Sequence, residues 1–463
     1  MLFRRMFSML HARDRLARAS RLTRRIRPVS AFGTRAVSAL GALAVLAVLA
    51  FPATRAAAQD TSAASRPDSL AARIEALERS VKLLREQLAA QASSGATTRS
   101  RSPIEFSGRI LMNAFINQGR SNNVDVPTFA VPAAKSFQDH SGGASFRQTI
   151  LSFTAQGAKL WGADASASLE GDFFGGVQTG AGGRLLFPEP RLRIAKLTLA
   201  WETGELMVGQ DVSLITPVLP VGLAALGEPT FAGSGHLWAW LPQVRVTKTL
   251  GASGPVTWAL QGALVSPWGG HWLAGDVDST DFGERTRLPF VQARLRARWG
   301  EEEMRGEVGV GVHYGWIATL GDTNLTSNAV SLTWQVPFTS WMEMRGEAYT
   351  GQVLQGLGDG GAGQNFGQNA LGKKIPLRDT GGWLQLNFKP DAGWTLGFGA
   401  GRSQPNDSDL PDITRNDLAE AHMIWRPGGL PVISLELKEI QTTYRATGLS
   451  RTRQVNLGFG VEF

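Results

Sequence analysis

The sequence has no cysteine, so it can form neither disulfide bonds nor thiolate metal sites. It also has no recognisable P-loop, dinucleotide-binding fingerprint, zinc motif or EF-hand, and its six histidines are scattered along the chain. These absences remove the usual sequence evidence for a cofactor, and we expect none.

The formal net charge of the whole sequence is +8, but the chain after residue 58 has no excess of either sign. Residues 1–58 contain eleven of the 47 lysines and arginines but only one of the 39 acidic residues, Asp14, which leaves 36 basic and 38 acidic side chains in the rest of the chain. A nearly neutral chain gives no electrostatic support for binding nucleic acid, and we expect no such partner.

The first 58 residues have the three parts of a secretory signal peptide. An arginine-rich region ends near Arg35, an apolar run extends from Ala39 to Phe51, and small residues precede Gln59. The apolar run is too short for a spanning helix. We therefore expect residues 1–58 to be removed after export, the alternative being an uncleaved anchor.

From about Ile104 to Phe463, apolar and polar side chains alternate over stretches of about ten residues. The clearest stretch is the last, where one parity holds Val455, Leu457, Phe459, Val461 and Phe463 and the other holds Gln454, Asn456, Gly458, Gly460 and Glu462. Successive side chains of a strand point to opposite faces, so each stretch predicts one apolar and one polar face. Repetition over 104–463 without helical segments predicts a closed, all-β transmembrane barrel in the outer membrane of a Gram-negative-type bacterium.

The breaks between these stretches predict the number of strands. Seven short breaks lie at 157–160, 202–205, 251–255, 300–303, 337–340, 390–393 and 427–431. Eight longer polar or glycine-rich stretches lie at about 119–143, 175–190, 212–241, 266–288, 318–327, 352–379, 403–416 and 446–451. Fifteen connections join 16 antiparallel strands, with short turns in the periplasm and longer loops outside. A barrel of this size encloses an aqueous channel.

Six tryptophans beside the short breaks carry the apolar parity and predict an aromatic girdle at the periplasmic interface. They are Trp161, Trp201, Trp299, Trp334, Trp394 and Trp425. The alternative is that they are core aromatics of a soluble β-sandwich.

Residues 70–90 have the clearest helical pattern. Apolar residues recur there at spacings of four and three: Leu70, Ile74, Leu77, Val81, Leu84 and Leu88. This heptad seam predicts a periplasmic coiled coil that associates copies of the chain, between a polar segment (59–69) and a linker (91–103). The coil by itself favours two strands and the barrel favours a trimer; we expect a trimer. The alternative is an amphipathic helix lying on the barrel or the membrane surface.

The polar parity of the predicted strands indicates which side chains line the channel. It selects Arg109, Lys196, Gln243, Arg245, Gln292, Arg294, Arg296, Arg298 and Arg345, together with the acidic Glu170 and Asp172. An arginine facing lipid near the midplane costs about 2–4 kcal/mol. The three arginines that alternate along one predicted strand, Arg294, Arg296 and Arg298, must therefore face water. A row of cations concentrates anions, which predicts a preference for small anionic solutes. The alternative is that these charges pair with each other and only keep the pore wet.

The third long stretch, about 212–241, is mostly apolar and contains Pro217, Pro220 and Pro229. An apolar loop exposed to solvent is unfavourable, so we expect it to fold inward and narrow the pore. Trp238 and Trp240 near its end could seat it. The alternative is an external loop buried at a subunit contact.

Five segments resemble those of DcaP-like outer-membrane porins. They are Phe146-Arg147-Gln148, Leu169 to Phe174 (LEGDFF), Arg191 to Ala195 (RLRIA), Val208-Gly209-Gln210 and Leu241 to Arg245 (LPQVR). The family has the same order of signal peptide, short coiled coil, linker and barrel.

The resemblance implies a 16-strand trimeric porin with a periplasmic helix and an inward third loop, which passes small, often dicarboxylic solutes. By matching motif, it implies that wall or constriction positions are held by Arg147, Glu170, Asp172, Arg193, Gln210 and Arg245. The alternation alone is ambiguous for Arg147 and places Arg193 on the outward parity. The terminal Phe463 resembles the signal read by the outer-membrane assembly machinery.

Two other functions compete with a passive porin. A hydrolase needs a nucleophile, a base and an orienting group at one place, and neither His313 nor His422 has a serine or aspartate at a convincing spacing. We therefore expect no enzyme activity. A non-conducting structural or adhesive barrel, tethered in the periplasm by its coiled coil, is the stronger alternative.

Overall fold

The computed structural model describes residues 96–97, 103–133, 139–175, 188–270, 280–319 and 324–463. The predicted signal peptide, the segment 59–69, the coiled-coil residues from Leu70 to Leu88 and most of the linker 91–103 lie outside the described residues. No helix within the described ranges is long and apolar enough to cross a membrane.

One sheet contains nearly all of the strands. The strands are β1 (Ala96–Thr97), β2 (Pro103–Gln118), β3 (His140–Ser145), β4 (Ile150–Leu160), β5 (Ala163–Asp172), β6 (Arg191–Trp201), β7 (Gly204–Val212), β8 (Trp240–Ser253), β9 (Val256–Val265), β10 (Phe290–Trp299), β11 (Gly306–Ala318), β12 (Asn324–Thr339), β13 (Met342–Gln352), β14 (Phe366–Gln368), β15 (Lys374–Pro376), β16 (Arg378–Phe388), β17 (Trp394–Pro405), β18 (Ile413–Trp425), β19 (Pro431–Tyr444) and β20 (Gly448–Glu462). Short helical turns are η1 (Glu284–Thr286), η2 (Glu302–Met304), η3 (Gln355–Leu357), α4 (Gly360–Gly363) and η4 (Asp407–Asp409).

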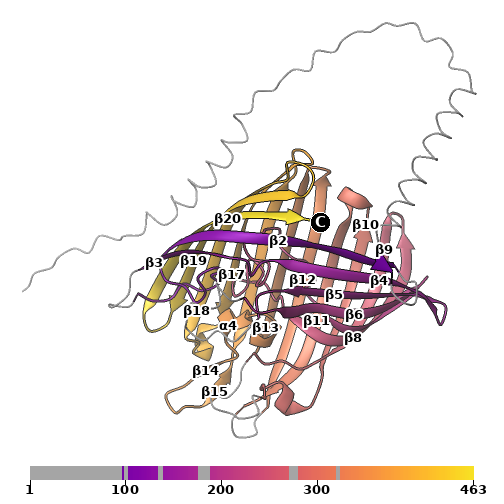
Figure 1. Cartoon of the computed structure of the whole chain (residues 1–463). Coiled ribbons are helices and arrows are strands. Elements are labelled where there is room, and N and C mark those ends of the chain that lie inside the picture. Colours follow the sequence, from indigo (N-terminus) through magenta and orange to yellow (C-terminus); the bar gives the residue numbers. More distant parts are fainter. Residues whose placement is uncertain (1–95, 98–102, 134–138, 176–187, 271–279, 320–323) are drawn as a thin grey trace, which may run out of the picture. The chain divides into compact units, whose positions relative to one another are not determined.

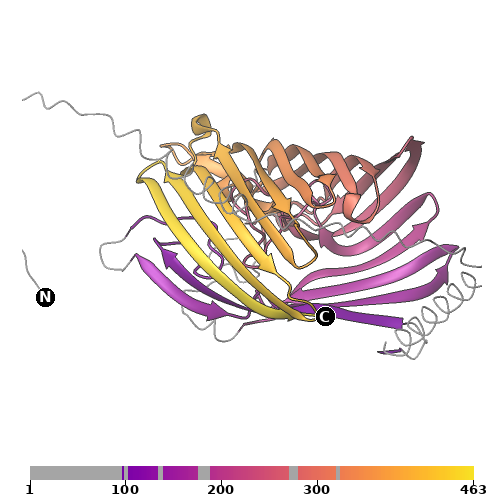
Figure 2. The ribbon, with the colours of Figure 1, turned by 90° about the horizontal axis from the view of Figure 1, so that it is seen from above.

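The sheet closes into a barrel because β2 pairs with β20, and Figure 1 shows these two strands side by side. In Figure 2 the yellow β20 meets the indigo β2 near the C-terminus. The terminal residue continues this pairing, since the backbone N–H groups of Gly108 and Phe463 each donate to the carbonyl of the other, at 2.9 and 3.0 Å.

The barrel has 16 antiparallel strands, as the alternation predicts. The short β3 and β4 form one of them, because β3 pairs with Asn113–Gln118 of β2 and β4 pairs with the part before it. A break at residues 146–149 separates the two pieces. The hairpin β14–β15 is a separate two-stranded sheet within the connection between β13 and β16.

The two faces of the wall follow the predicted period of two. On β20, Gln454 and Asn456 face inward and are buried, whereas Val455 and Leu457 face outward and are exposed. The predicted tryptophans of the strands have the outward parity, and Trp394 stacks on Trp425 with ring centroids 5.6 Å apart. The short connections lie at the same end of the barrel as these tryptophans, and we call it the short-turn end.

One predicted long connection is wrong. The stretch expected at 446–451 is only the three-residue turn 445–447, because β20 already begins at Gly448. Arg451 in this stretch belongs to the strand and lies on its outer face, as does Arg453 just beyond it. A polar outer face hides the alternation and resembles a loop in sequence.

Candidate functional site

The connection between β7 and β8, residues 213–239 (loop 3), runs through the interior of the barrel. Its buried residues include Leu214, Ile215, Leu223, Phe231 and Leu237, each at most 1% exposed. Leu214, Ile215 and Leu237 belong to the largest buried apolar cluster, which also contains residues of β9, β11 and β12. The apolar side chains of loop 3 are therefore buried against the inner wall of the barrel.

Side chains of the wall hold loop 3 by its backbone. The Glu347 carboxylate of β13 accepts from the Leu237 N–H at 3.0 Å. The Glu436 carboxylate of β19 accepts from the backbone N–H groups of Leu223 and Ala224. The Gln385 amide of β16 accepts from Val221 N–H at 2.7 Å and donates to Val221 C=O at 2.8 Å. Such contacts across several strands fix the path of the loop.

Glycines on the inner face of β17 leave room for loop 3. A Cβ at Gly399 would lie 2.8 Å from Phe231, and a Cβ at Gly401 would collide with the Ser234 carbonyl. Phe231 fills this space and stacks on Trp383 with centroids 5.3 Å apart. On the loop side, Gly235 has φ +100° and touches the backbone of β16 and β17, which a side chain would prevent.

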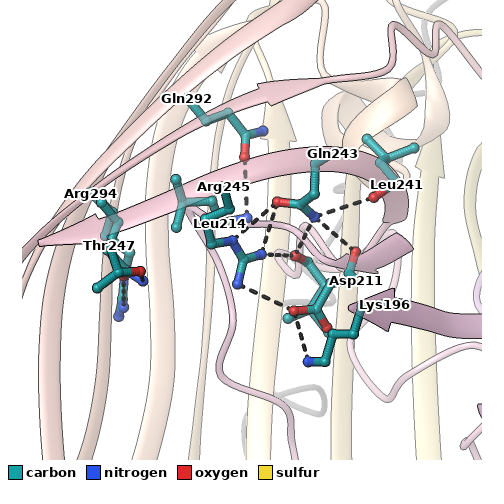
Figure 3. Close-up of polar contacts among 11 residues, drawn as sticks. Lys196, Asp211, Leu214, Leu241, Gln243, Arg245, Thr247, Gln292 and Arg294 are labelled. Carbon is teal, nitrogen blue, oxygen red and sulfur yellow. Dashed lines mark hydrogen bonds and ion pairs between the residues drawn. The ribbon is translucent and has the colours of Figure 1, made fainter. Parts of the chain in front are cut away.

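Both ends of loop 3 meet one polar cluster (Figure 3). Figure 3 shows Lys196 and Arg245 directed at Asp211, with Lys196 Nζ at 3.1 Å and Arg245 Nη1 at 3.3 Å from Asp211 Oδ2. The Gln243 amide donates to the carbonyls of Asp211 and Leu241, which flank the loop. These side chains fix the loop ends, and of the cations Lys196 keeps the larger exposure, 29% of its side chain.

The three arginines of β10 (the arginine ladder, Arg294, Arg296 and Arg298) face inward but differ in exposure. Arg294 is buried, with Nη2 2.7 Å from Glu307 Oε1, and its guanidinium lies against Gly309, where a Cβ would collide with it. Arg298 also contacts Glu307, yet 47% of its side chain is exposed. Arg296 is partly exposed and has no carboxylate partner among the described residues.

A second group of arginines lies near the long-loop end. Arg147, in the break between β3 and β4, is buried against Asp125 at 2.8 Å and lies 3.6 Å from the Phe174 ring centroid. Burial raises the pKa of the Asp125 carboxyl, and Arg147 opposes this rise. Arg147 is therefore enclosed in an ion pair.

Arg193 corrects the outward placement given by the alternation. Glu170 pairs with Ile194 while Gly171 pairs with Leu192, so Arg193 is the extra residue of a β-bulge. Its side chain is buried, with Nε 3.3 Å from Glu170 and 3.8 Å from Asp172. Arg191 binds the same Asp172 at 2.6 Å.

Gln210 is also misplaced by the motif match. It pairs with Ala195 and Pro242, on the face opposite to Gln243, so it lies on the outer side of the wall. Its amide donates to the carbonyls of Leu192 and Arg193, both at 3.0 Å, beside the bulge. Gln210 therefore supports the wall and does not line the interior.

The other predicted lining residues face inward, in two groups. Asp172, Gln243, Arg245, Gln292 and Arg294 are buried in contacts. Arg109, Glu170, Lys196, Arg296, Arg298 and Arg345 keep partial or full exposure. Gln292 holds loop 3, because its side-chain oxygen accepts from Leu214 N–H at 3.1 Å. Arg345 donates to the carbonyl of Leu219 at 3.3 Å.

Inward charges of both signs line the interior in two groups, and each group contacts the opposite sign, as Asp211 does with Arg245 and Arg345 does with Glu343. The basic wall comprises inward cations of β6, β8 and β10: Arg191, Arg193, Lys196, Arg245 and the arginine ladder. The acidic wall comprises inward carboxylates of β13, β16, β18 and β19: Glu343, Glu347, Asp379, Glu420 and Glu436. All five carboxylates are at most 7% exposed, and two of them, Glu347 and Glu436, bind loop 3. The strand order of the closed barrel places the two walls opposite each other.

Sequence reasoning missed the residues that hold loop 3 on the acidic wall. Glu436 and Gln385 lie on the polar parity, but nothing in their local sequence distinguishes an anchor from a water-facing side chain. The glycine alternation of β17 (Gly397, Gly399 and Gly401) is a visible signal, since a strand without inward side chains over five residues leaves room for another segment or large side chain to approach closely.

Besides Asp125, two more carboxyl groups of the loops have raised pKa values. Burial raises the pKa of Glu228 in loop 3 to about 8; the Asp359 carboxylate adds to the rise and Arg191 opposes it. Burial raises the pKa of Asp359, in the connection between β13 and β16, to about 6. At neutral pH the Glu228 side chain is therefore mostly protonated, and loop 3 adds little negative charge to the interior.

The histidines show no open catalytic arrangement in the described part of the chain. His313 Nε2 does contact Ser327 Oγ at 3.0 Å, a pairing the sequence spacing did not suggest. The Ser327 hydroxyl donates to the Val353 carbonyl at 2.8 Å, and both residues are buried. His422 pairs with Glu420 at 3.2 Å. Across the described residues, no group of three His, Asp or Glu is placed to hold a metal.

The sequence matches no family model and no curated protein. Among solved structures, the outer membrane channel DcaP of Acinetobacter baumannii aligns with a TM-score of 0.61 at 15% identity, over 80% of this chain and 99% of its own. An anion-selective porin from Comamonas acidovorans gives 0.49 at 12% identity, over 78% and 100%. The in-vitro folded OmpT of Vibrio cholerae gives 0.48 at 9%, over 80% and 100%.

The fold is thus that of the 16-stranded porin-type barrels. More particularly, the chain shares the fold of DcaP, so the predicted resemblance to DcaP-like porins is confirmed at the level of the fold.

Proposed function

We propose that this chain is an outer-membrane porin, a passive diffusion channel for small hydrophilic solutes that prefers anions, including dicarboxylates. The observation that supports this best is the unequal covering of the interior. Loop 3 binds the acidic wall through backbone N–H groups that donate to Glu347 and Glu436, and it meets the basic wall at Gln292 and Arg191. On the basic wall, Lys196 and Arg296 stay partly exposed and Arg298 stays exposed, although Lys196 also contacts Asp211 and Arg298 also contacts Glu307.

The charge that remains exposed sets the electrostatic potential felt by a solute. Buried carboxylates that accept backbone N–H bonds are compensated, whereas exposed guanidinium groups attract anions. Arg296 and Arg298 are two residues apart on one face of β10, about 7 Å along the strand. This spacing suits the two ends of a small dicarboxylate. No bond is made or broken, so transport needs neither a catalytic residue nor a cofactor.

The outer face supports a membrane location, because large apolar side chains such as Val246, Leu264 and Val291 are exposed over it. We propose that lipid covers this face and that the chain is a homotrimer joined by the coiled coil of residues 70–90 in the periplasm. The terminal Phe463 packs on Phe106, with centroids 5.2 Å apart, and is proposed as the contact for the assembly machinery.

Planar-bilayer recording tests the proposal. The full chain is expected to give open current steps with reversal potentials biased toward anions. Arg296→Gln with Arg298→Gln should lower the anion-to-cation permeability ratio several-fold, more for a dicarboxylate than for a monocarboxylate. Arg294 stays unchanged because it is buried and paired with Glu307. Lys248→Gln, which removes a cation from the outer face of β8, is the matched control.

Two outcomes would contradict the proposal. An unchanged reversal potential in the double variant would remove the arginine ladder as the selectivity element. A complete absence of conductance would favour the second candidate, a non-conducting structural barrel. The many contacts that fix loop 3 across the interior support this candidate.

A further inference from the structure

Four arginines of β17, β18 and β20 lie together on the outer face of the barrel, where alternation should place apolar residues. Arg402 of β17 and Arg415 of β18 share Asp417, at 2.5 and 2.9 Å. Arg453 and Arg451 of β20 share Glu439 of β19, at 2.7 and 3.3 Å. We call these six residues the outer arginine belt.

The register joins the belt across neighbouring strands. Arg402 is paired with Asp417, Asp417 with Gln441 and Gln441 with Arg451, so these four side chains form one row. Residues directly opposite in a sheet share a face, which puts the whole row on the outer surface. Between 40% and 56% of each arginine side chain is exposed.

The height of the belt corresponds to an edge of the apolar band. Arg402 lies eight residues along β17 from Trp394, which marks the short-turn end. At about 3.4 Å per residue and a tilt of about 40°, this is roughly 20 Å along the barrel axis. A lipid-facing band is about 25 Å tall, so the guanidinium groups reach the level of the headgroups on the long-loop side.

The belt does not continue onto β9 and β10. At the same distance from the short-turn end, β9 carries Leu264 and β10 carries Val291, both outward and exposed. The outer faces of β8 to β10 offer no carboxylate at this height among the described residues, so a second copy docking there would leave the arginines against apolar wall.

Two of the four arginines compensate the charges of Asp417 and Glu439. The other two leave the belt with a surplus of two positive charges. Guanidinium groups bind phosphate oxygens through paired hydrogen bonds. Resting on the proposed membrane location, we propose that the outer arginine belt binds the phosphate groups of a phosphorylated lipid in the outer leaflet.

The test variant removes the surplus and keeps each ion pair. Arg415→Gln with Arg451→Gln leaves Asp417 with Arg402 and Glu439 with Arg453. Lys248→Gln with Lys389→Gln removes two exposed cations near the short-turn end and is the charge-matched control. Lipid A, a bis-phosphorylated glycolipid, is titrated onto the detergent-extracted full chain, and bound lipid is counted by native mass spectrometry.

Wild type and control should bind lipid A with equal affinity, and the double variant about 30-fold more weakly, from a factor of about five per arginine near a charged surface. Conductance of the double variant should match wild type, which separates this result from a failure of the porin proposal. Inorganic phosphate at the same concentration should not displace the lipid.

Three results would overturn the inference. One is unchanged lipid binding in the double variant. A second is displacement of lipid A by inorganic phosphate, which would indicate a small-anion site. The third is efficient disulfide crosslinking between copies of a Gln441→Cys variant, since the chain has no other cysteine and the belt would then lie at a subunit contact.

Discussion

The basic and acidic walls of the interior carry comparable numbers of charges but treat them differently. On the acidic wall, Glu347 and Glu436 bind loop 3 and are almost fully buried. On the basic wall, Arg294 is buried in the same way, while Arg296 and Arg298 on the same strand stay partly or fully exposed. Net charge is therefore a poor guide to a channel, because a compensated buried charge and an exposed charge act differently on a passing solute.

The largest effect should come from breaking the buried end of the arginine ladder. Arg294→Met leaves Glu307 with only Arg298 and should lower the free energy of unfolding by about 3 kcal/mol, since breaking one side of a buried ion pair is costly. Arg296→Met should change the free energy of unfolding by less than about 0.5 kcal/mol, because Arg296 is partly exposed and has no carboxylate partner among the described residues. Urea unfolding of the barrel in lipid vesicles measures both. Equal losses would mean that the two arginines do not differ in environment.

Loosening loop 3 from the acidic wall should come next in size. Glu347→Ala leaves the Leu237 N–H and His236 without their partner, at a cost of about 1–3 kcal/mol. A less firmly held loop should raise the single-channel conductance and its noise. Glu202→Ala, in the exposed turn between β6 and β7, should leave both quantities unchanged. A quiet channel of wild-type conductance in the Glu347 variant would show that other contacts suffice.

The smallest effect should be a dependence of selectivity on pH. The pKa of Glu228 is raised from 4.5 to about 8, so loop 3 gains a negative charge as the pH rises through 8. The anion preference should fall roughly two-fold between about pH 6 and pH 9. The same shift favours the folded state fully below pH 4.5 and loses this contribution as the pH rises through about 8. Reversal potentials of Glu228→Gln should be flat over this range; a slope equal to wild type would exclude Glu228 as the titrating group.

The number of strands and their inward faces follow from the sequence because one physical rule, alternation, applies along the whole chain. The errors arise where that rule is locally broken. A bulge turns Arg193 inward, and the outer arginine belt makes the start of β20 resemble a loop. Neither the bulge nor the belt has a composition that marks it in a single sequence.

The contacts of loop 3 with the wall could not be predicted at all. Glu436 and Gln385 accept from a segment more than 160 residues away, so their role depends on where that segment runs. Alternation predicts that these residues face inward but gives no information on whether water or a backbone amide meets them. For the candidate site, the sequence therefore predicts whether a side chain points inward or outward, and the fold determines whether an inward side chain is exposed to water.

Because the wall binds loop 3 mainly through its main chain, and through the side chains of only a few residues such as His236 and Phe231, the pore can be resized without changing the path of the loop. Apolar residues such as Val221 and Leu226 are only partly buried and can be exchanged for smaller or larger ones while the amide contacts persist. The barrel therefore offers a rigid frame with a replaceable lining, a useful starting point for engineering nanopores of graded width.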